Sequence, residues 1–173
     1  MNPAADIRSD DHVLGKHEAE VIVIQYGDYQ CPYTARAHGI LEGLREQMGD
    51  SLCLVYRHLP LSKLHPAAEM AAEAAEGAGA QGKFWEMHAA LFDNQAALSA
   101  DILPQLAQDL GLDGARMDDD LARRRHRGRV EADAAQAAEL GARKTPTFFI
   151  NGERHLGDSD QASLEAAIAN ARQ

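Results

Sequence analysis

The sequence has few cysteines and no long apolar run. It contains 2 Cys among 173 residues, whereas a small secreted fold held together by disulfides has more. No segment is long and apolar enough to cross a bilayer as a helix. The polar, mixed-charge residues 1–20 lack the apolar core of a signal peptide. We therefore expect a cytoplasmic protein that is not embedded in a membrane.

Positive charge is also scarce. The 17 Lys and Arg residues are outnumbered by 27 Asp and Glu, which gives a formal net charge of -10. Such a chain repels nucleic acids and anionic membranes, so we expect neither as a partner. The one basic run, residues 123–129, follows the acidic residues 118–120. Acids that precede bases by four positions form ion pairs on a helix surface, so we interpret the run as a solvated helix face.

Metal binding is not indicated either. His12 and His17 have no further ligands near them in the sequence, whereas a zinc site needs three or four. The length and the 45% hydrophobic content suit one globular domain with a full core. We expect a single domain over residues 1–173, with a loose, solvated leader over residues 1–10.

The most informative stretch is residues 21–34, VIVIQYGDYQCPYT. Its first four residues are apolar and β-branched, which predicts a strand buried on both faces. A helix should follow, with Cys31 in its first turn and Pro32 just inside it, where proline is tolerated. The unpaired N–H groups and the positive end of the helix dipole favour a thiolate over a thiol. The stretch therefore predicts a reactive cysteine on a strand-to-helix turn.

Four stretches together resemble the DsbA-like branch of the thioredoxin-fold thiol–disulfide oxidoreductases, from about residue 11 to the end of the chain. They are YGDYQCPY at 26–33, RHLPL at 57–61, GKFWEMH at 82–88 and KTPTFFING at 144–152. The resemblance implies an α/β, thioredoxin-like fold with a mixed central sheet. Its parts would be a βαβ unit, a helical insertion at about residues 62–128 and a closing ββα unit.

The resemblance also identifies an active site. It implies that Cys31 is catalytic within the motif that includes Pro32 and Tyr33, and that the Thr145–Pro146 bond is cis and faces it. The backbone of Thr145 would then pair with an extended substrate.

The chain departs from the family at two positions. Thr34 occupies the place of the second, resolving cysteine of the usual C-x-x-C motif, and Gln25 occupies the place of a buried acid six residues before Cys31. In the family that acid is thought to take the proton of the resolving thiol. Without such a thiol, a buried carboxylate would only cost desolvation energy. We therefore interpret the replacement of the resolving cysteine by Thr34 and of the buried acid by Gln25 as functionally linked changes.

The leading hypothesis is an enzyme that performs monothiol thiol–disulfide exchange through Cys31, with no bound cofactor. Cys31 would form a mixed disulfide with a thiol or disulfide protein or peptide, and an external thiol, glutathione among the candidates, would resolve it. Thr34 would donate its hydroxyl hydrogen to the Cys31 thiolate, and Asp28 would oppose that stabilisation. Two alternatives remain open: a redox-silent peptide-binding module that keeps the Pro146 groove, and a glutathione-dependent transferase or isomerase.

Cys53 is not expected to take part. It lies near the start of a second strand, residues 51–57, that a helical crossover should make parallel to the first. Cys31 follows the opposite end of its strand, so about 10 Å or more should separate the two, beyond the ~7 Å limit for a disulfide. In the loop that follows, His58 and His65 are interpreted as histidines bonded to backbone, with proximity to Cys31 as the alternative.

Overall fold

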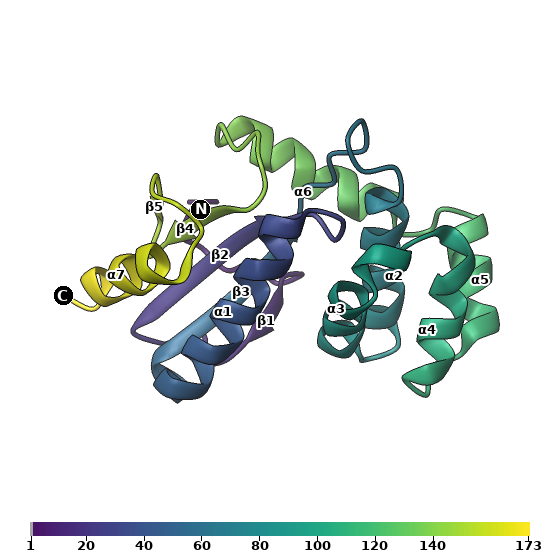
Figure 1. The fold of residues 1–173 in the computed structure, drawn as a ribbon, viewed down its shortest axis with the longest axis horizontal. Coiled ribbons are helices and arrows are strands. Elements are labelled where there is room, and N and C mark those ends of the chain that lie inside the picture. Colours follow the sequence, from purple (N-terminus) through teal and green to yellow (C-terminus); the bar gives the residue numbers. More distant parts are fainter. Residues whose placement is uncertain (1) are drawn as a thin grey trace. The chain divides into compact units, whose positions relative to one another are not determined.

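The computed structural model describes residues 2–173, which divide into two compact units (Figure 1). The first unit contains residues 2–27, 31–57 and 136–173, and the second contains Asp28–Gln30 and His58–Ala135. The helical insertion expected at about residues 62–128 corresponds to the second unit, which begins four residues earlier and ends seven residues later. Three residues directly before Cys31 also belong to it.

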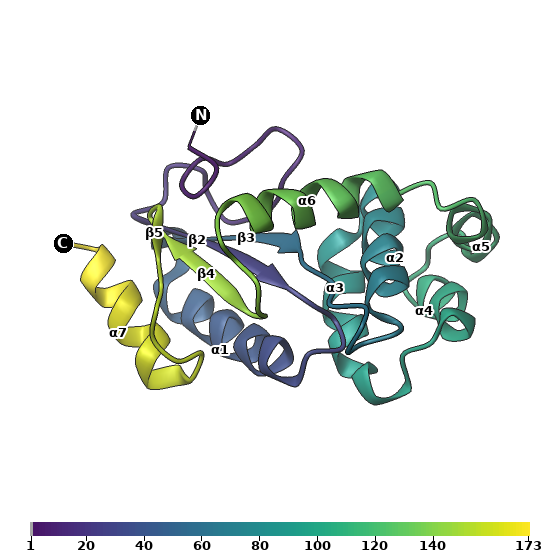
Figure 2. The ribbon, with the colours of Figure 1, turned by 90° about the horizontal axis from the view of Figure 1, so that it is seen from above.

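A five-stranded sheet forms the centre of the first unit. Its strands are β1 (His12–Leu14), β2 (Val21–Gly27), β3 (Leu52–His58), β4 (Thr147–Ile150) and β5 (Glu153–Arg154), in the order β1-β3-β2-β4-β5. The pairs β1/β3, β2/β4 and β4/β5 are antiparallel, and Figure 2 shows β2 and β3 running in the same direction. The sheet is therefore mixed, as expected for a thioredoxin-like fold. Strand β1 was not predicted.

Two helices, α1 (Pro32–Met48) and α7 (Gln161–Ala171), cover one face of this sheet (Figure 2). Gly49 ends α1 with a φ of 55°, as the sequence predicted, and a short 3-10 turn leads into β3. The core between the sheet and the two helices consists of buried apolar side chains: Val21, Val23, Ala37, Leu41, Leu44, Leu52, Leu54, Phe148, Ile150, Leu164 and Ile168.

The turn between β4 and β5 is the Asn-Gly hairpin that the sequence predicted. Asn151 and Gly152 both have a positive φ, 48° and 86°, as a type I′ turn requires. The Asn151 side chain also accepts a hydrogen bond from the Ile22 N–H at 2.8 Å and donates to the carbonyls of Glu20 and Ala171 at 3.1 and 3.2 Å. This residue therefore joins the start of β2 and the end of α7 to the hairpin.

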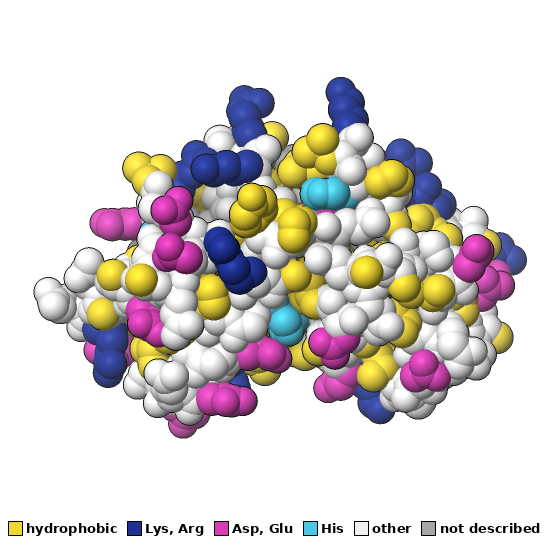
Figure 3. All heavy atoms as spheres, viewed as in Figure 1, with side chains coloured by type: hydrophobic (Ala, Val, Ile, Leu, Met, Phe, Trp, Pro, Cys, Tyr) yellow, Lys and Arg dark blue, Asp and Glu magenta, His cyan; other side chains and the backbone are white. Residues whose placement is uncertain are grey.

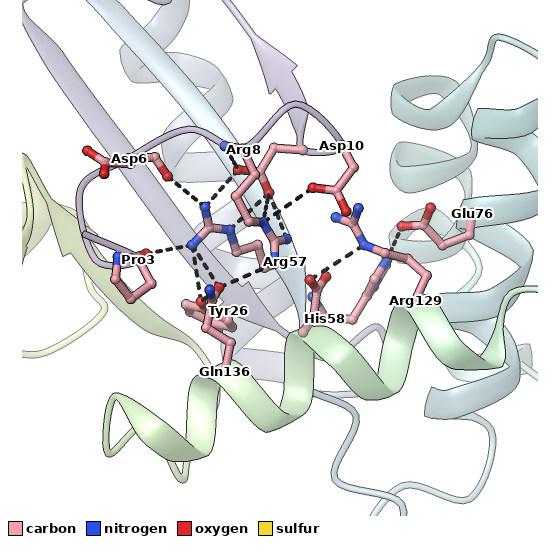
Figure 4. A network of polar contacts seen from close by, with 12 residues as sticks. Pro3, Asp6, Arg8, Asp10, Tyr26, Arg57, His58, Glu76, Arg129 and Gln136 are labelled. Carbon is pink, nitrogen blue, oxygen red and sulfur yellow. Dashed lines mark hydrogen bonds and ion pairs between the residues drawn. The ribbon is translucent and has the colours of Figure 1, made fainter. Parts of the chain in front are cut away.

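The N-terminal segment surrounds a buried arginine (Figure 4). Arg57, at the end of β3, forms an ion pair with Asp11 at 2.7 Å and donates to the carbonyls of Pro3 and Asp6 at 2.7 and 2.9 Å. Tyr26 and Gln136 supply two further acceptors. A buried charge needs such partners, and the leader provides them. The expectation of a loose leader is therefore wrong for residues 2–10, and Met1 lies outside the described residues.

The second unit is helical. It contains α2 (Ala68–Ala80), α3 (Phe84–Asp93), α4 (Leu103–Asp109), α5 (Gly114–Ala122) and the first part of α6 (Arg127–Glu139). The basic run at 123–129 was expected on one solvated helix face, but residues 123–126 form the turn between α5 and α6. Arg123 pairs with Asp119 at 2.7 Å as expected, whereas Arg124 pairs with Glu69 and Glu73 of α2. Between residues 2 and 173, no helix combines the length and the apolar character that crossing a membrane requires.

Candidate active site

Cys31 immediately precedes helix α1. It is the N-cap residue, with φ -76° and ψ 120°, and Pro32 occupies the first helical position. The sequence predicted Cys31 inside the first turn, but a residue before proline is pushed towards extended backbone, so the helix starts one residue later. Cys31 is only 4% exposed, whereas Tyr33 is 59% exposed. The sulfur therefore lies at the positive end of the helix dipole in a largely buried residue.

The Thr145–Pro146 turn lies against Cys31. The peptide bond between Thr145 and Pro146 is cis, and the Thr145 carbonyl oxygen accepts a hydrogen bond from the Cys31 thiol at 3.5 Å. The Thr147 hydroxyl donates to the Lys144 carbonyl at 2.6 Å, which closes the turn. The fold thus brings together the two stretches that the resemblance assigned to one site.

Thr34 is fully buried one turn after Cys31. Its Cγ2 methyl group would lie 2.7 Å from a Cβ placed on Gly27, and a ring carbon of Tyr56 would lie 2.6 Å from the same point. Only glycine at position 27 allows the first turn of α1 to approach β2 and β3 this closely. Gly27 and Tyr56 were not predicted as site residues, because nothing in their local sequence marks the contact.

Gln25 lies on the same face of β2 as the core residues Val21 and Val23, because side chains alternate along a strand. It is 5% exposed, and its Nε2 has no hydrogen-bond partner among the described residues. The amide is therefore buried on the α1 side of the sheet. A carboxylate in its place would lose more hydration energy than this neutral group does.

A groove adjoins the Thr145–Pro146 turn. It has a volume of about 410 Å³ and lies between Tyr33, residues 144–148 and residues 154–159. All of these belong to the first unit. The groove therefore borders the active-site motif and the cis-proline turn at once, which suits a substrate site.

Cys53 is fully buried, and neither it nor Cys31 forms a disulfide. Burial raises the pKa of Cys53 to about 11, because a thiolate is poorly solvated in an apolar setting. Cys53 therefore fits the expected role of a small buried hydrophobic residue.

His58, the last residue of β3, and His65, in the loop after it, bind carboxylates in the second unit. His58 contacts Glu76 at 2.7 Å, and His65 contacts Asp28 at 2.8 Å. The prediction that both bond to backbone is wrong, because the fold buries these two acids beside them. Asp28 also accepts hydrogen bonds from the N–H groups of Gln30 and Leu61. Its carboxylate thus orders the loop, a role that the sequence did not indicate.

The aromatic residues of the GKFWEMH stretch form part of the second unit's core. The Tyr29 hydroxyl and His88 Nδ1 are 2.8 Å apart, and the rings of Phe84 and Phe92 pack on His88. Across residues 2–173, no group of three or more His, Cys, Asp or Glu side chains is arranged to hold a metal ion.

Comparison with known proteins gives matches over nearly the whole chain. The family model described as "Thioredoxin" matches residues 8–170. The Na(+)/H(+) antiporter NhaA 1 of Mycobacterium sp. (strain KMS) is 42% identical over 166 residues, which cover 94% of this chain and 27% of that protein. The chain therefore spans about a quarter of the length of the curated relatives it matches.

Solved structures match over similar extents. A thioredoxin-like oxidoreductase from Silicibacter pomeroyi is 31% identical, with a TM-score of 0.79 over 95% of this chain and 94% of that one. DsbA2 from Pseudomonas aeruginosa is 26% identical, with a TM-score of 0.75 over 94% of this chain and 95% of that one.

Proposed function

Because the chain belongs to the thioredoxin family, in its DsbA-like branch, we propose that it is a thiol–disulfide oxidoreductase with Cys31 as its single catalytic thiol. The observation that supports this best is the 3.5 Å contact between the Cys31 sulfur and the Thr145 carbonyl, beside the cis Pro146 bond. The contact holds the thiol at a helix start and at the edge of a groove.

The reaction begins with the Cys31 thiolate. It attacks one sulfur of a substrate disulfide, a new S–S bond forms, and the other sulfur leaves as a thiolate. Thr34 has no thiol to attack the resulting mixed disulfide, so an external thiol, glutathione in our proposal, must do so. The Thr34 hydroxyl stabilises the Cys31 thiolate by hydrogen bonding.

In this proposal the Thr145–Pro146 turn and the motif residues Pro32 and Tyr33 bind the substrate. The Thr145 backbone would pair with an extended thiol or disulfide peptide. We place the reaction in the cytoplasm, where glutathione keeps thiols reduced.

A redox-silent peptide-binding role is the second candidate. The low exposure of Cys31 favours it, because a nucleophilic thiol must be reached by its substrate. In that role the groove beside Pro146 would bind peptides without any covalent step.

Turnover of a peptide–glutathione mixed disulfide, with reduced glutathione in excess, separates the two functions. We expect the protein to accelerate peptide release and Cys31→Ser to abolish the acceleration, while Cys53→Ala keeps it. Equal rates with the wild-type protein and Cys31→Ser would contradict the enzymatic function. A glutathione-conjugation assay on the same proteins tests the transferase alternative.

A further inference from the structure

Basic side chains lie around the groove beside Cys31, although the protein as a whole is acidic. Its walls contribute Lys144 and Arg154 against one acid, Asp158, although the whole chain has a net charge of -10. Figure 3 shows Lys and Arg side chains projecting from the surface over the end of α6 and the segment that leads to β4. Local charge opposite to that of the whole protein attracts an anionic ligand.

A further arginine lies at the rim of the groove. The Arg36 guanidinium is 5.6 Å from the centre of the Tyr33 ring and donates to the Ser159 hydroxyl at 3.4 Å. Both of its partners line the groove and neither is charged. The positive charge of Arg36 is therefore added to that of the walls.

The two basic side chains of the walls are not neutralised by acids. Arg154 donates to the Gly141 carbonyl at 3.0 Å, which holds its position without cancelling its charge. In the part of the chain that the structure describes, no carboxylate lies within ion-pair distance of Lys144, which is exposed. Lys144 therefore remains available to a ligand.

The groove adjoins the contact between Thr145 and Cys31, although Cys31 itself is not among the residues that line it. Thr145 lines it and also contacts the Cys31 thiol through its carbonyl oxygen. The Thr145 hydroxyl oxygen is buried and has no hydrogen-bond partner among residues 2–173, so a polar group of a ligand can pair with it. The volume of about 410 Å³ lies within the range of about 300–1,000 Å³ that is typical of small-molecule sites.

We propose that this groove selects small disulfides that have carboxylates near their sulfur atoms, with Lys144 and Arg154 as the residues that determine specificity. The inference rests on the proposed function, because it concerns the partner of Cys31. With oxidised glutathione, the Cys31 thiolate forms an S–S bond to one glutathione sulfur, and the original S–S bond breaks to release one glutathione thiolate. No further oxidant is needed, because one disulfide replaces another.

Three disulfides test the proposal: oxidised glutathione, which is anionic, its ester with all carboxylates blocked, and cystamine, which has no carboxylate and is cationic. The rate of adduct formation on Cys31 is followed by intact mass and peptide mapping. We expect oxidised glutathione to react fastest. Lys144→Gln should slow its reaction by about two- to fivefold, as loss of one partly exposed charge pair predicts. The rate with cystamine should not fall.

Lys16→Gln is the matched control. It removes the same charge from an exposed lysine of the same unit that does not line the groove, and it should leave all three rates unchanged. Arg154→Gln is the second variant, and adding it to Lys144→Gln should slow the reaction with oxidised glutathione further. Added salt should reduce the preference, because it screens exposed charges.

The outcomes separate this inference from the proposed function. Adducts on Cys31 at equal rates for all three reagents, or a preference unchanged by both variants, would overturn the charge selection and leave the exchange reaction standing. No adduct on Cys31 with any reagent would overturn both. A faster reaction with the disulfide of an acidic peptide than with oxidised glutathione would overturn the assignment to small substrates.

Discussion

The Cys31 sulfur lies 3.5 Å from the Thr145 carbonyl oxygen, although 114 positions separate the two residues. The contact places the backbone of the cis-proline turn against the Cys31 thiol. An extended substrate that pairs with the Thr145 backbone would therefore lie beside this sulfur.

The two thiols should differ in reactivity. We expect a brief alkylation at pH 8 to modify Cys31 roughly tenfold or more faster than Cys53. With a pKa of about 11, only about one thousandth of Cys53 is thiolate at that pH. Peptide mapping after quenching measures both rates, and Cys31→Ser shows the background. Preferential modification of Cys53 would be incompatible with the proposed site.

Oxidation should join the protein to another thiol and not join its own two cysteines. Neither cysteine forms a disulfide in the structure, and Cys53 lies in the core strand β3. After incubation with oxidised glutathione, we expect intact mass to show one glutathione adduct per chain. A monomer that loses two hydrogens without an adduct would show that Cys31 and Cys53 form a bridge.

Thr34→Cys should create an internal disulfide with Cys31. Residue 34 is one helical turn away and already has a buried side chain, so the new sulfur can attack a mixed disulfide. Turnover of a dithiol peptide should rise. The rise should be incomplete, because Gln25 cannot accept the proton of the new thiol.

The double variant Gln25→Glu/Thr34→Cys tests whether the two positions changed as a pair. It should be more active than Thr34→Cys, whereas Gln25→Glu alone should lower the free energy of unfolding by about 1–3 kcal/mol. Equal activity of the double variant and Thr34→Cys would disprove the pairing. Absence of any internal disulfide in Thr34→Cys would cast doubt on the placement of Cys31.

Asp11→Asn should destabilise the fold in a pH-dependent way. Burial opposes ionisation, but the hydrogen bonds and charge of Arg57 lower the pKa of Asp11 below its ordinary value of 3.8. A carboxyl with a lowered pKa stabilises the folded state above its unfolded pKa and loses this effect as the pH falls. At pH 7 the variant should lose about 3–5 kcal/mol, as expected when a buried ion pair is broken.

Urea unfolding at several pH values measures this effect. The difference between wild type and Asp11→Asn should shrink as the pH falls from 5 to 3. Asp50→Asn is the control, because Asp50 pairs with Lys16 in an exposed position and should contribute less than about 1 kcal/mol. A difference that stays constant with pH would show that the charge of Asp11 is not the cause.

Gly27→Ala should disturb the packing around Thr34 in the candidate active site. The new methyl group would meet both Thr34 and Tyr56 at less than 3 Å, and overpacking of this kind costs about 1–3 kcal/mol. Gly39→Ala is the control in α1, where a Cβ meets nothing within 4 Å. It should raise the free energy of unfolding by about 0.5–1 kcal/mol. A thermal melt in which both variants behave alike would refute the close contact.

Local patterns in the sequence predicted most of the fold. The β-branched run before Cys31 became β2, the Asn-Gly pair became the hairpin turn, and Gly49 ended α1. Each of these features depends on a few neighbouring residues, whose backbone preferences do not need the rest of the chain.

Long-range polar contacts could not be predicted in this way. The Arg57–Asp11 pair joins residues 46 positions apart, and the His65–Asp28 contact joins residues 37 positions apart. A charged residue in the sequence does not show whether it will be buried, or which acid will be buried with it. The close approach at Gly27 was missed for the same reason, since it depends on how α1 crosses the sheet.

The turn at Asn151 makes the protein sensitive to chemical ageing. An asparagine before glycine is a thermolabile pair, and its spontaneous deamidation replaces the amide with a carboxylate. The side chain would then lose the N–H groups that it donates to the carbonyls of Glu20 and Ala171, and its negative charge would face those oxygens. Slow deamidation of Asn151 would therefore loosen the start of β2 and the end of α7 together. Its rate would limit how long the folded chain keeps this structure.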